Sequence, residues 1–155
     1  MTAANRHGPG PARLASALIG AWGLYQLLAG LYFIFFRPSL LPEDLRASGT
    51  TLDVVRKAAP GMEAWLQWVF AVLGGQMAAA EVLVMSGAIG IFVRRSPDRV
   101  ETGAYIVAGF LSVVLMCGAN FALESAYRWL LVAPAFLWFA AMIPLGHRAF
   151  GGSAR

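Results

Sequence analysis

The residue that most directly suggests chemistry is an acid in the middle of a long apolar segment. Glu81 stands within the run QMAAAEVLVMSG, near the centre of residues 62–93 of this 155-residue chain. A charged side chain at the centre of a bilayer costs roughly 3 kcal/mol or more, so acids at that depth usually face the interior of a helix bundle. Small residues on the same helical face let another helix approach closely. We therefore expect Glu81 to point into the bundle, where desolvation favours its neutral form.

A second polar side chain, Gln26, lies at a similar depth in the apolar residues 14–36. Its amide can donate a hydrogen bond to a carboxylate, which makes Gln26 the nearest candidate partner for Glu81. Two interpretations of this pair stay open. It is either a binding site for a proton, a cation or a polar ligand, or a hydrogen-bonded contact that only fixes helix packing. The second is favoured, because no buried basic residue is evident as a counter-ion.

Three further polar residues follow one another at four-residue spacing after the apolar segment 103–121. Asn120 and Glu124 share a helical face, and Arg128 stands four residues beyond Glu124. Residues four apart on a helix are neighbours. This spacing predicts either a polar cluster at the outer mouth of the bundle, where a ligand or proton binds, or an ion pair that only fixes a hairpin turn. The second interpretation is favoured here too.

Other kinds of chemistry are poorly represented in the sequence. His7 and His147 lie outside the apolar segments, which argues against a membrane haem held by two buried histidines. The single cysteine, Cys117, cannot form an intramolecular disulfide and is interpreted as a packing residue. The sequence contains none of the patterns of zinc proteases, P-loop proteins or serine hydrolases. We therefore predict no catalytic residues, no metal site and no cofactor, and favour a protein that is not an enzyme.

Four long apolar segments predict the fold. A helix of about 20 apolar residues crosses the hydrocarbon core, whereas a transmembrane strand would alternate apolar and polar residues. Apolar residues make up 59% and charged residues 13% of the chain, against about 25% charged in an average soluble domain. The predicted fold is an all-α membrane protein, a four-helix transmembrane bundle that forms a single domain over residues 14–146. Its spans are expected at about residues 14–36, 62–93, 103–121 and 129–146.

The segments outside these spans are polar. Residues 1–13 are predicted to be disordered and residues 147–155 to form a short tail. In the first connection, Pro42 with two following acids predicts a helix start, and Thr51 predicts a second one. We expect both to be short amphipathic helices on the membrane surface.

Small residues also recur at four-residue spacing along one helical face of residues 62–93. Ala71, Gly75 and Ala79 form a small-xxx-small stripe. Such a stripe favours close helix packing or a dimer. Lipid, a second copy of the chain or a larger membrane complex are therefore the expected partners.

The basic residues predict the orientation. The side with both termini and the loop 94–101 carries seven Lys and Arg residues, and the opposite side carries five. Because basic loops stay in the cytoplasm, both termini are predicted to be cytoplasmic in an inner (plasma) membrane. The net charge of +4 does not indicate a nucleic-acid partner, because the charges lie in termini and loops. Arg outnumbers Lys eleven to one, a bias that is common in bacteria rich in G and C.

Two stretches carry a resemblance to a known family. The first apolar segment ends in LLAGLYFIFFRP, and after an outer connection the second contains LGGQMAAAEVLVMSGAIGIFVRRSP. Together with a tight last hairpin, this order of parts resembles the small bacterial four-span proteins of the DoxX-like type. The resemblance implies a fold more than an activity and assigns a role to no residue.

Two functions stay open from the sequence. One is an accessory subunit or homo-oligomeric module without catalytic activity, which the packing stripe and the lack of catalytic groups favour. The alternative is a proton-coupled small-molecule transporter that uses Glu81, with Gln26 lining its path. A third and weaker interpretation is a redox-associated subunit that contacts quinone through its aromatic residues.

Overall fold

The computed structural model describes residues 10–94 and 98–150, with side chains to residue 147, and these residues contain helices and turns but no strand. A five-residue π-helical segment, η1, joins α5 to α6, so that the three form one continuous helical segment over residues 99–122. The elements in chain order are α1 (Pro11–Phe35), α2 (Pro42–Ser48), α3 (Leu52–Ala58), α4 (Met62–Arg94), α5 (Arg99–Gly109), η1 (Phe110–Val114), α6 (Leu115–Ala122) and α7 (Val132–Phe150).

Three helical segments are long and apolar enough to cross a membrane, judged by length and composition. They are α1, α4 and the continuous segment Arg99–Ala122. The apolar part of α7 is shorter and covers Val132–His147, whereas a full crossing takes about 20 residues. Over residues 10–94 and 98–150 the chain is therefore all-helical, with three helices suited to a bilayer.

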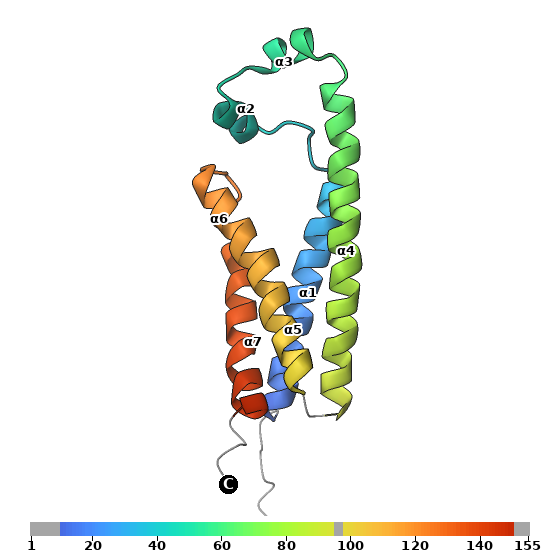
Figure 1. Cartoon of the computed structure of the whole chain (residues 1–155), viewed down its shortest axis with the longest axis vertical. Helices are drawn as coiled ribbons and strands as arrows, with labels where there is room; N and C mark the ends of the chain where they lie inside the picture. Colours follow the sequence, from blue (N-terminus) through green and yellow to red (C-terminus); the bar gives the residue numbers. More distant parts are fainter. Residues whose placement is uncertain (1–9, 95–97, 151–155) are drawn as a thin grey trace, which may run out of the picture.

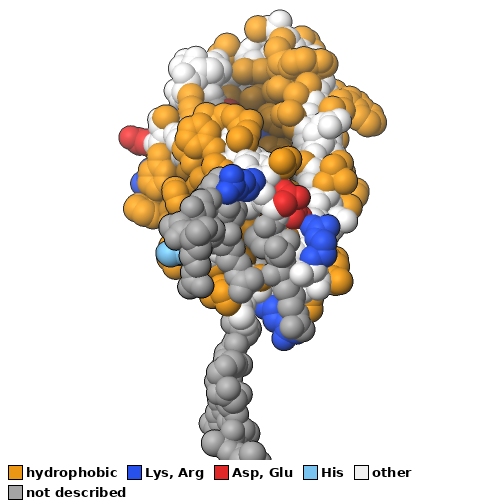
Figure 2. Space-filling model, turned by 60° about the horizontal axis from the view of Figure 1, so that its bottom comes forward, with side chains coloured by type: hydrophobic (Ala, Val, Ile, Leu, Met, Phe, Trp, Pro, Cys, Tyr) orange, Lys and Arg blue, Asp and Glu red, His pale blue; other side chains and the backbone are white. Residues whose placement is uncertain are grey.

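The long helices lie side by side, with α1 between α4 and α7 (Figure 1). The segment that begins with α5 packs against α7. At one end of the molecule α1 and α5 begin and α4 and α7 end, and α2 and α3 lie at the opposite end (Figure 1). Several Lys and Arg side chains surround the end at which α1 begins (Figure 2). We call the end that carries α2 and α3 the α2–α3 end, and the other the basic end.

The contact between α1 and α4 repeats every seven residues on both helices. Seven residues are close to two turns of a helix, so these positions share a face. Ser16 Oγ donates to the carbonyl oxygen of Ala88 at 2.6 Å. A Cβ atom at Gly74 would lie 2.5 Å from the carbonyl oxygen of Gly30, so the two backbones touch there. The contacting pairs, in order along α1, are Ser16 with Ala88, Gly23 with Glu81, and Gly30 with Gly74.

This contact does not use the predicted stripe of small residues on α4. A Cβ atom at Gly75 would meet nothing within 4 Å, and Ala79 is exposed. One residue turns a helix by about 100°, so Gly74 faces α1 while Gly75 faces away from it. The stripe Ala71, Gly75 and Ala79 is thus left on the outer surface of α4.

The core lies where α1, α4, α5 and α7 approach one another. Buried side chains of these helices and of η1 pack there in one cluster. Trp138 of α7 donates its indole N–H to the carbonyl oxygen of Tyr105 at 3.0 Å, and Gly109 leaves room for this indole. The fully packed cluster contains Ala15, Ile19, Trp22, Ala88, Ile91, Tyr105, Val113, Trp138, Ala141 and Leu145.

Several helix ends differ from the bounds expected from hydropathy. α1 begins at Pro11 rather than near residue 14, because proline is well suited to a first turn. α5 begins at Arg99 rather than near 103, because the Asp98 side chain accepts from the Glu101 N–H at 2.6 Å and caps the helix. α7 begins at Val132 rather than near 129, since residues 123–131 form a series of turns. Residues 1–9 and 151–155 of the predicted terminal segments lie outside the described part of the chain.

The first connection contains two short capped helices. Pro42 is the first residue of α2, and the Asp44 side chain accepts from the Leu41 N–H at 2.9 Å. Gly49 ends α2 with a φ of 64°, a left-handed conformation that glycine adopts without a steric penalty. Thr51 caps α3 by accepting from the Val54 N–H at 3.4 Å.

Candidate functional site

The buried face of α1 positions two polar side chains next to each other. Trp22 is fully buried and Gln26 is 2% exposed. They are four residues apart, so their directions differ by about 40° around the helix. Both therefore project into the interior of the bundle rather than toward its surface.

Glu81 reaches the same region from α4. Its side chain is 5% exposed, and it lies on the face that contacts α1. A Cβ atom at Gly23 would lie 3.6 Å from Glu81 Oε2 and 2.8 Å from Met85 Cγ. The carboxyl group is thus packed against the α1 backbone at Gly23, and the lack of a side chain at that glycine makes room for it.

Helix geometry places Trp22, Gln26 and the contact of Glu81 with Gly23 on one side of α1. Around α1, Gly23 lies about 100° and Gln26 about 40° from the direction of Trp22. The direction of Gln26 therefore lies between that of Trp22 and that of Gly23, against which Glu81 packs. We call Trp22, Gln26 and Glu81 the polar site.

Each member of the polar site has a buried atom without a hydrogen-bond partner in the part of the chain that the structure describes. These atoms are Trp22 Nε1, Gln26 Oε1 and Glu81 Oε2. About nine in ten or more buried polar atoms in proteins have a partner, so three such atoms from neighbouring residues are unusual. Gln26 and Glu81 are thus both buried, and no hydrogen bond between them is formed.

A fourth buried atom without a partner, Ser112 Oγ, lies on the π-helical segment η1. The next residue, Val113, belongs to the same core cluster as Trp22. π-helical turns often occur at functional sites, because the wider turn redirects side chains. Sequence reasoning missed both Ser112 and η1.

The remaining predicted site residues lie near the α2–α3 end. Asn120 Nδ2 donates to the carbonyl oxygen of Met116 on its own helix at 2.9 Å. Glu124 is exposed and has a φ of 50°, and its carbonyl oxygen accepts from Arg46 at 3.4 Å. Within the described residues, no hydrogen bond or ion pair joins the side chains of Asn120, Glu124 and Arg128 to one another. Arg128 is partly exposed and its backbone N–H donates to the carbonyl oxygen of Ser125.

A hydrogen bond between two other residues connects α2 to the last turn, which is the series of turns at residues 123–131. Ser125 Oγ donates to Glu43 Oε1 at 2.8 Å, and both side chains are buried. The two residues are 82 positions apart in the chain. The sequence carries no local pattern that would have predicted this contact.

A buried arginine, Arg37, lies at the same end of the molecule. The Arg37 guanidinium pairs with Asp44 at 3.2 Å and lies 3.4 Å from the centre of the Phe70 ring. A guanidinium on an aromatic face is attracted by the ring and keeps its hydrogen-bonding edge free. Arg37 thus links α1, α2 and α4. The only feature of the sequence that could have indicated this contact was the aromatic run before Arg37.

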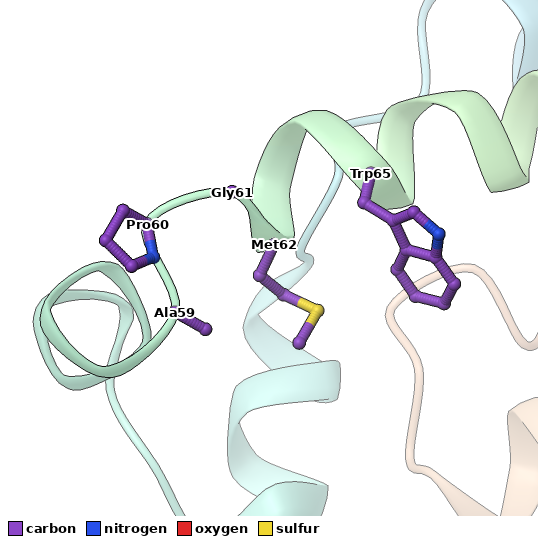
Figure 3. A pocket seen from close by; sticks show the side chains of 5 residues that line it. All are labelled: Ala59, Pro60, Gly61, Met62 and Trp65. Atoms are coloured by element: carbon purple, nitrogen blue, oxygen red, sulfur yellow. The ribbon is translucent and has the colours of Figure 1, made fainter.

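An open apolar depression lies at the junction of α3 and α4 (Figure 3). It has a volume of about 450 Å³ and is lined by Ala59, Pro60, Gly61, Met62 and Trp65. Trp65 stands sixteen residues before Glu81, which corresponds to about 24 Å along a helix. The depression contains no group that could do chemistry and is separate from the polar site.

No family model, no curated protein and no solved structure matches the chain. In residues 10–94 and 98–150, no group of three or more His, Cys, Asp or Glu side chains could hold a metal ion. The resemblance to DoxX-like proteins therefore remains a prediction from the residue pattern.

The chemistry available at the polar site includes hydrogen bonding and proton binding. It offers one indole N–H donor, one amide oxygen acceptor and one carboxyl oxygen that accepts when ionised and donates when protonated. Such a set can hold a proton or a small polar ligand in an otherwise apolar interior.

Proposed function

We propose that the chain is a multi-pass protein of the inner (plasma) membrane, with both termini in the cytoplasm. In this proposal α1, α4, residues 99–122 and α7 make four crossings as a helix bundle. The alternation of helix ends between the two ends of the molecule supports it (Figure 1). The basic side chains around the end where α1 begins support the orientation, since basic segments stay in the cytoplasm (Figure 2).

In the same proposal, α2 and α3 lie on the opposite membrane surface. Exposed aromatic side chains near that end support this placement. Trp65, Trp68, Phe35 and Phe36 are exposed, and aromatic rings are enriched where hydrocarbon meets the headgroups. The apolar depression at the junction of α3 and α4 fits the same interfacial level.

We further propose that the chain acts as an accessory or oligomeric module without catalytic activity. The observation that supports this proposal is the position of α4. This helix packs mainly on α1, and the rest of its apolar surface is exposed. The outer surface includes the stripe Ala71, Gly75 and Ala79, where a helix of a second copy can approach closely. The DoxX-like pattern is compatible with such a module.

Disulfide cross-linking in native membranes tests this proposal. In a Cys117→Ser background, Gly75→Cys is expected to give a covalent dimer. Leu73→Cys is the control, because it is also exposed but points about 160° away from Gly75 around α4. A monomeric mass in lipid nanodiscs together with equal cross-linking at both positions contradicts the oligomeric module.

A proton-coupled carrier is the second candidate, and the unpartnered carboxyl oxygen of Glu81 favours it. Membrane-buried acids often carry protons across the bilayer. The test is proton flux in liposomes that contain the purified protein. Glu81→Gln is expected to abolish the flux, while Glu63→Gln, at the exposed start of α4, leaves it unchanged. If neither the wild type nor Glu63→Gln moves protons, the carrier function is wrong.

A further inference from the structure

We propose that Trp22, Gln26 and Glu81 bind one hydroxyl group between them, supplied either by an internal water or by a small hydroxyl-bearing organic molecule. This site does not depend on the accessory or the carrier function. It follows from three buried atoms, Trp22 Nε1, Gln26 Oε1 and Glu81 Oε2, that find no hydrogen-bond partner among the described residues.

The donor and acceptor types select the class of ligand. The indole N–H only donates, and the Gln26 oxygen only accepts. A ligand that satisfies both must accept one hydrogen bond and donate another. A hydroxyl oxygen does this, while an ammonium group has no lone pair for the indole and a halide ion has no hydrogen to donate. A water can also donate to Glu81 Oε2 with its second hydrogen, and buried waters make about three hydrogen bonds on average.

The packing of α1 on α4 fixes the level at which Glu81 meets α1. On one side, Ser16 Oγ donates to the carbonyl oxygen of Ala88 at 2.6 Å. On the other side, two turns beyond the site, Gly30 and Gly74 bring the backbones into contact. Between these two contacts stands Gly23, against whose backbone the side chains of Glu81 and Met85 pack.

Satisfied buried polar atoms elsewhere in the protein show why these three atoms need a ligand. The other buried indole, Trp138, donates to the Tyr105 carbonyl at 3.0 Å, and the buried Ser125 hydroxyl donates to Glu43 at 2.8 Å. Proteins partner such groups because an unpartnered buried donor or acceptor loses its hydrogen bonds to water without replacement. A single hydroxyl oxygen between the three atoms of the polar site completes the same pattern.

A high-resolution structure of the full chain in lipid nanodiscs tests the proposal directly. We expect one density peak within hydrogen-bond distance of Trp22 Nε1, Gln26 Oε1 and Glu81 Oε2. Native mass spectrometry then separates the two sources of the hydroxyl. The mass of the bare chain indicates water, and an added mass that Gln26→Met removes indicates an organic hydroxyl compound. Three side chains bonded to one another, with no density between them, overturn the proposal.

The thermal stability of variants gives a second, independent readout. Gln26→Met replaces the amide by an apolar chain of similar size. If a ligand satisfies the amide, this change lowers the unfolding temperature relative to Gln76→Met, an exposed position on α4. If the amide oxygen has no partner, the change raises that temperature and the proposal is wrong. Should Gln26→Met not fold, Trp22→Phe removes only the N–H donor and keeps most of the ring, with the same expected sign.

Discussion

Two adjacent glycines of α4 give a sharp test of how α1 and α4 pack. Gly74 faces α1, and a Cβ atom there would lie 2.5 Å from the Gly30 carbonyl oxygen and 2.8 Å from Phe33 Cβ. Gly75 faces outward, and a Cβ atom there would meet nothing within 4 Å. The same substitution, glycine to alanine, is therefore expected to have opposite effects at neighbouring positions.

The magnitudes follow from two opposing effects. Alanine favours a helix over glycine by about 1 kcal/mol, which is the whole expected gain at Gly75. At Gly74, an added methyl group in a packed contact costs about 1–3 kcal/mol. The cost should lie near the upper value, because the nearest atom is a backbone oxygen that cannot rotate away. We expect Gly74→Ala to destabilise the protein by about 2 kcal/mol net, since the helix gain offsets part of that cost.

The assay is reversible unfolding by sodium dodecyl sulfate in mixed micelles, followed by tryptophan fluorescence or circular dichroism. Gly75→Ala serves as the matched control at protein concentrations that keep the chain monomeric, because it alters helix propensity by the same amount without touching α1. The expected difference between the two variants is about 3 kcal/mol. Equal stability of Gly74→Ala and Gly75→Ala would refute the backbone contact between α1 and α4.

Substitutions at three further positions test the α2–α3 end in the same unfolding assay. Ser125→Ala removes the hydroxyl that donates to buried Glu43, and a loss of about 1–3 kcal/mol is expected; an unchanged midpoint means that Glu43 is solvated. Glu124 has a left-handed φ of 50°, which glycine adopts without a steric penalty, so Glu124→Gly should be neutral or stabilise the protein by up to about 1 kcal/mol. Glu124→Val should destabilise the protein. If Glu124→Val is instead the more stable variant, the assigned backbone conformation is wrong. Arg37→Lys removes the stacking of the guanidinium on the Phe70 ring and should lower the free energy of unfolding by about 1 kcal/mol. Full retention of stability indicates that only the charge of residue 37 matters.

The sequence was sufficient to predict the helices but not their ends. Apolar runs of more than twenty residues predict α1 and α4, because a backbone in hydrocarbon must form its hydrogen bonds internally. Residues such as Pro11 and Asp98 determine where a helix begins, and a hydropathy profile does not detect their effect. The start of α7 was misplaced because residues 129–131 are apolar but lie in turns.

The polar site was predictable only in part. Glu81 and Gln26 stand out as polar residues at the middle of apolar segments, where their cost demands an explanation. Trp22 gave no such signal, because an indole among apolar residues is expected to be core. Ser112 lies on a π-helical segment that follows the close contact of Gly109 with Trp138, and this contact joins residues 29 positions apart. Tertiary packing of that kind leaves no trace in local composition.

The pairing of neighbouring helix faces was also beyond the sequence. Gly74 and Gly75 are equally good candidates for a close helix contact, and the four-residue spacing favoured the face of Gly75. The structure uses Gly74, because it is seven residues from Glu81 and so shares the face that meets α1. Only the register of α1 against α4 decides between the two.

Four crossings by these helices are the central claim, and cysteine labelling in intact cells tests it most directly. In a Cys117→Ser background, single cysteines replace exposed residues in α3 (Asp53), in α5 (Val100) and in the last turn (Trp129). A membrane-impermeant maleimide is expected to label positions 53 and 129 in intact cells and position 100 only after permeabilisation. Labelling of all three from one side, or recovery of the full chain in water without detergent, would contradict a four-crossing membrane protein.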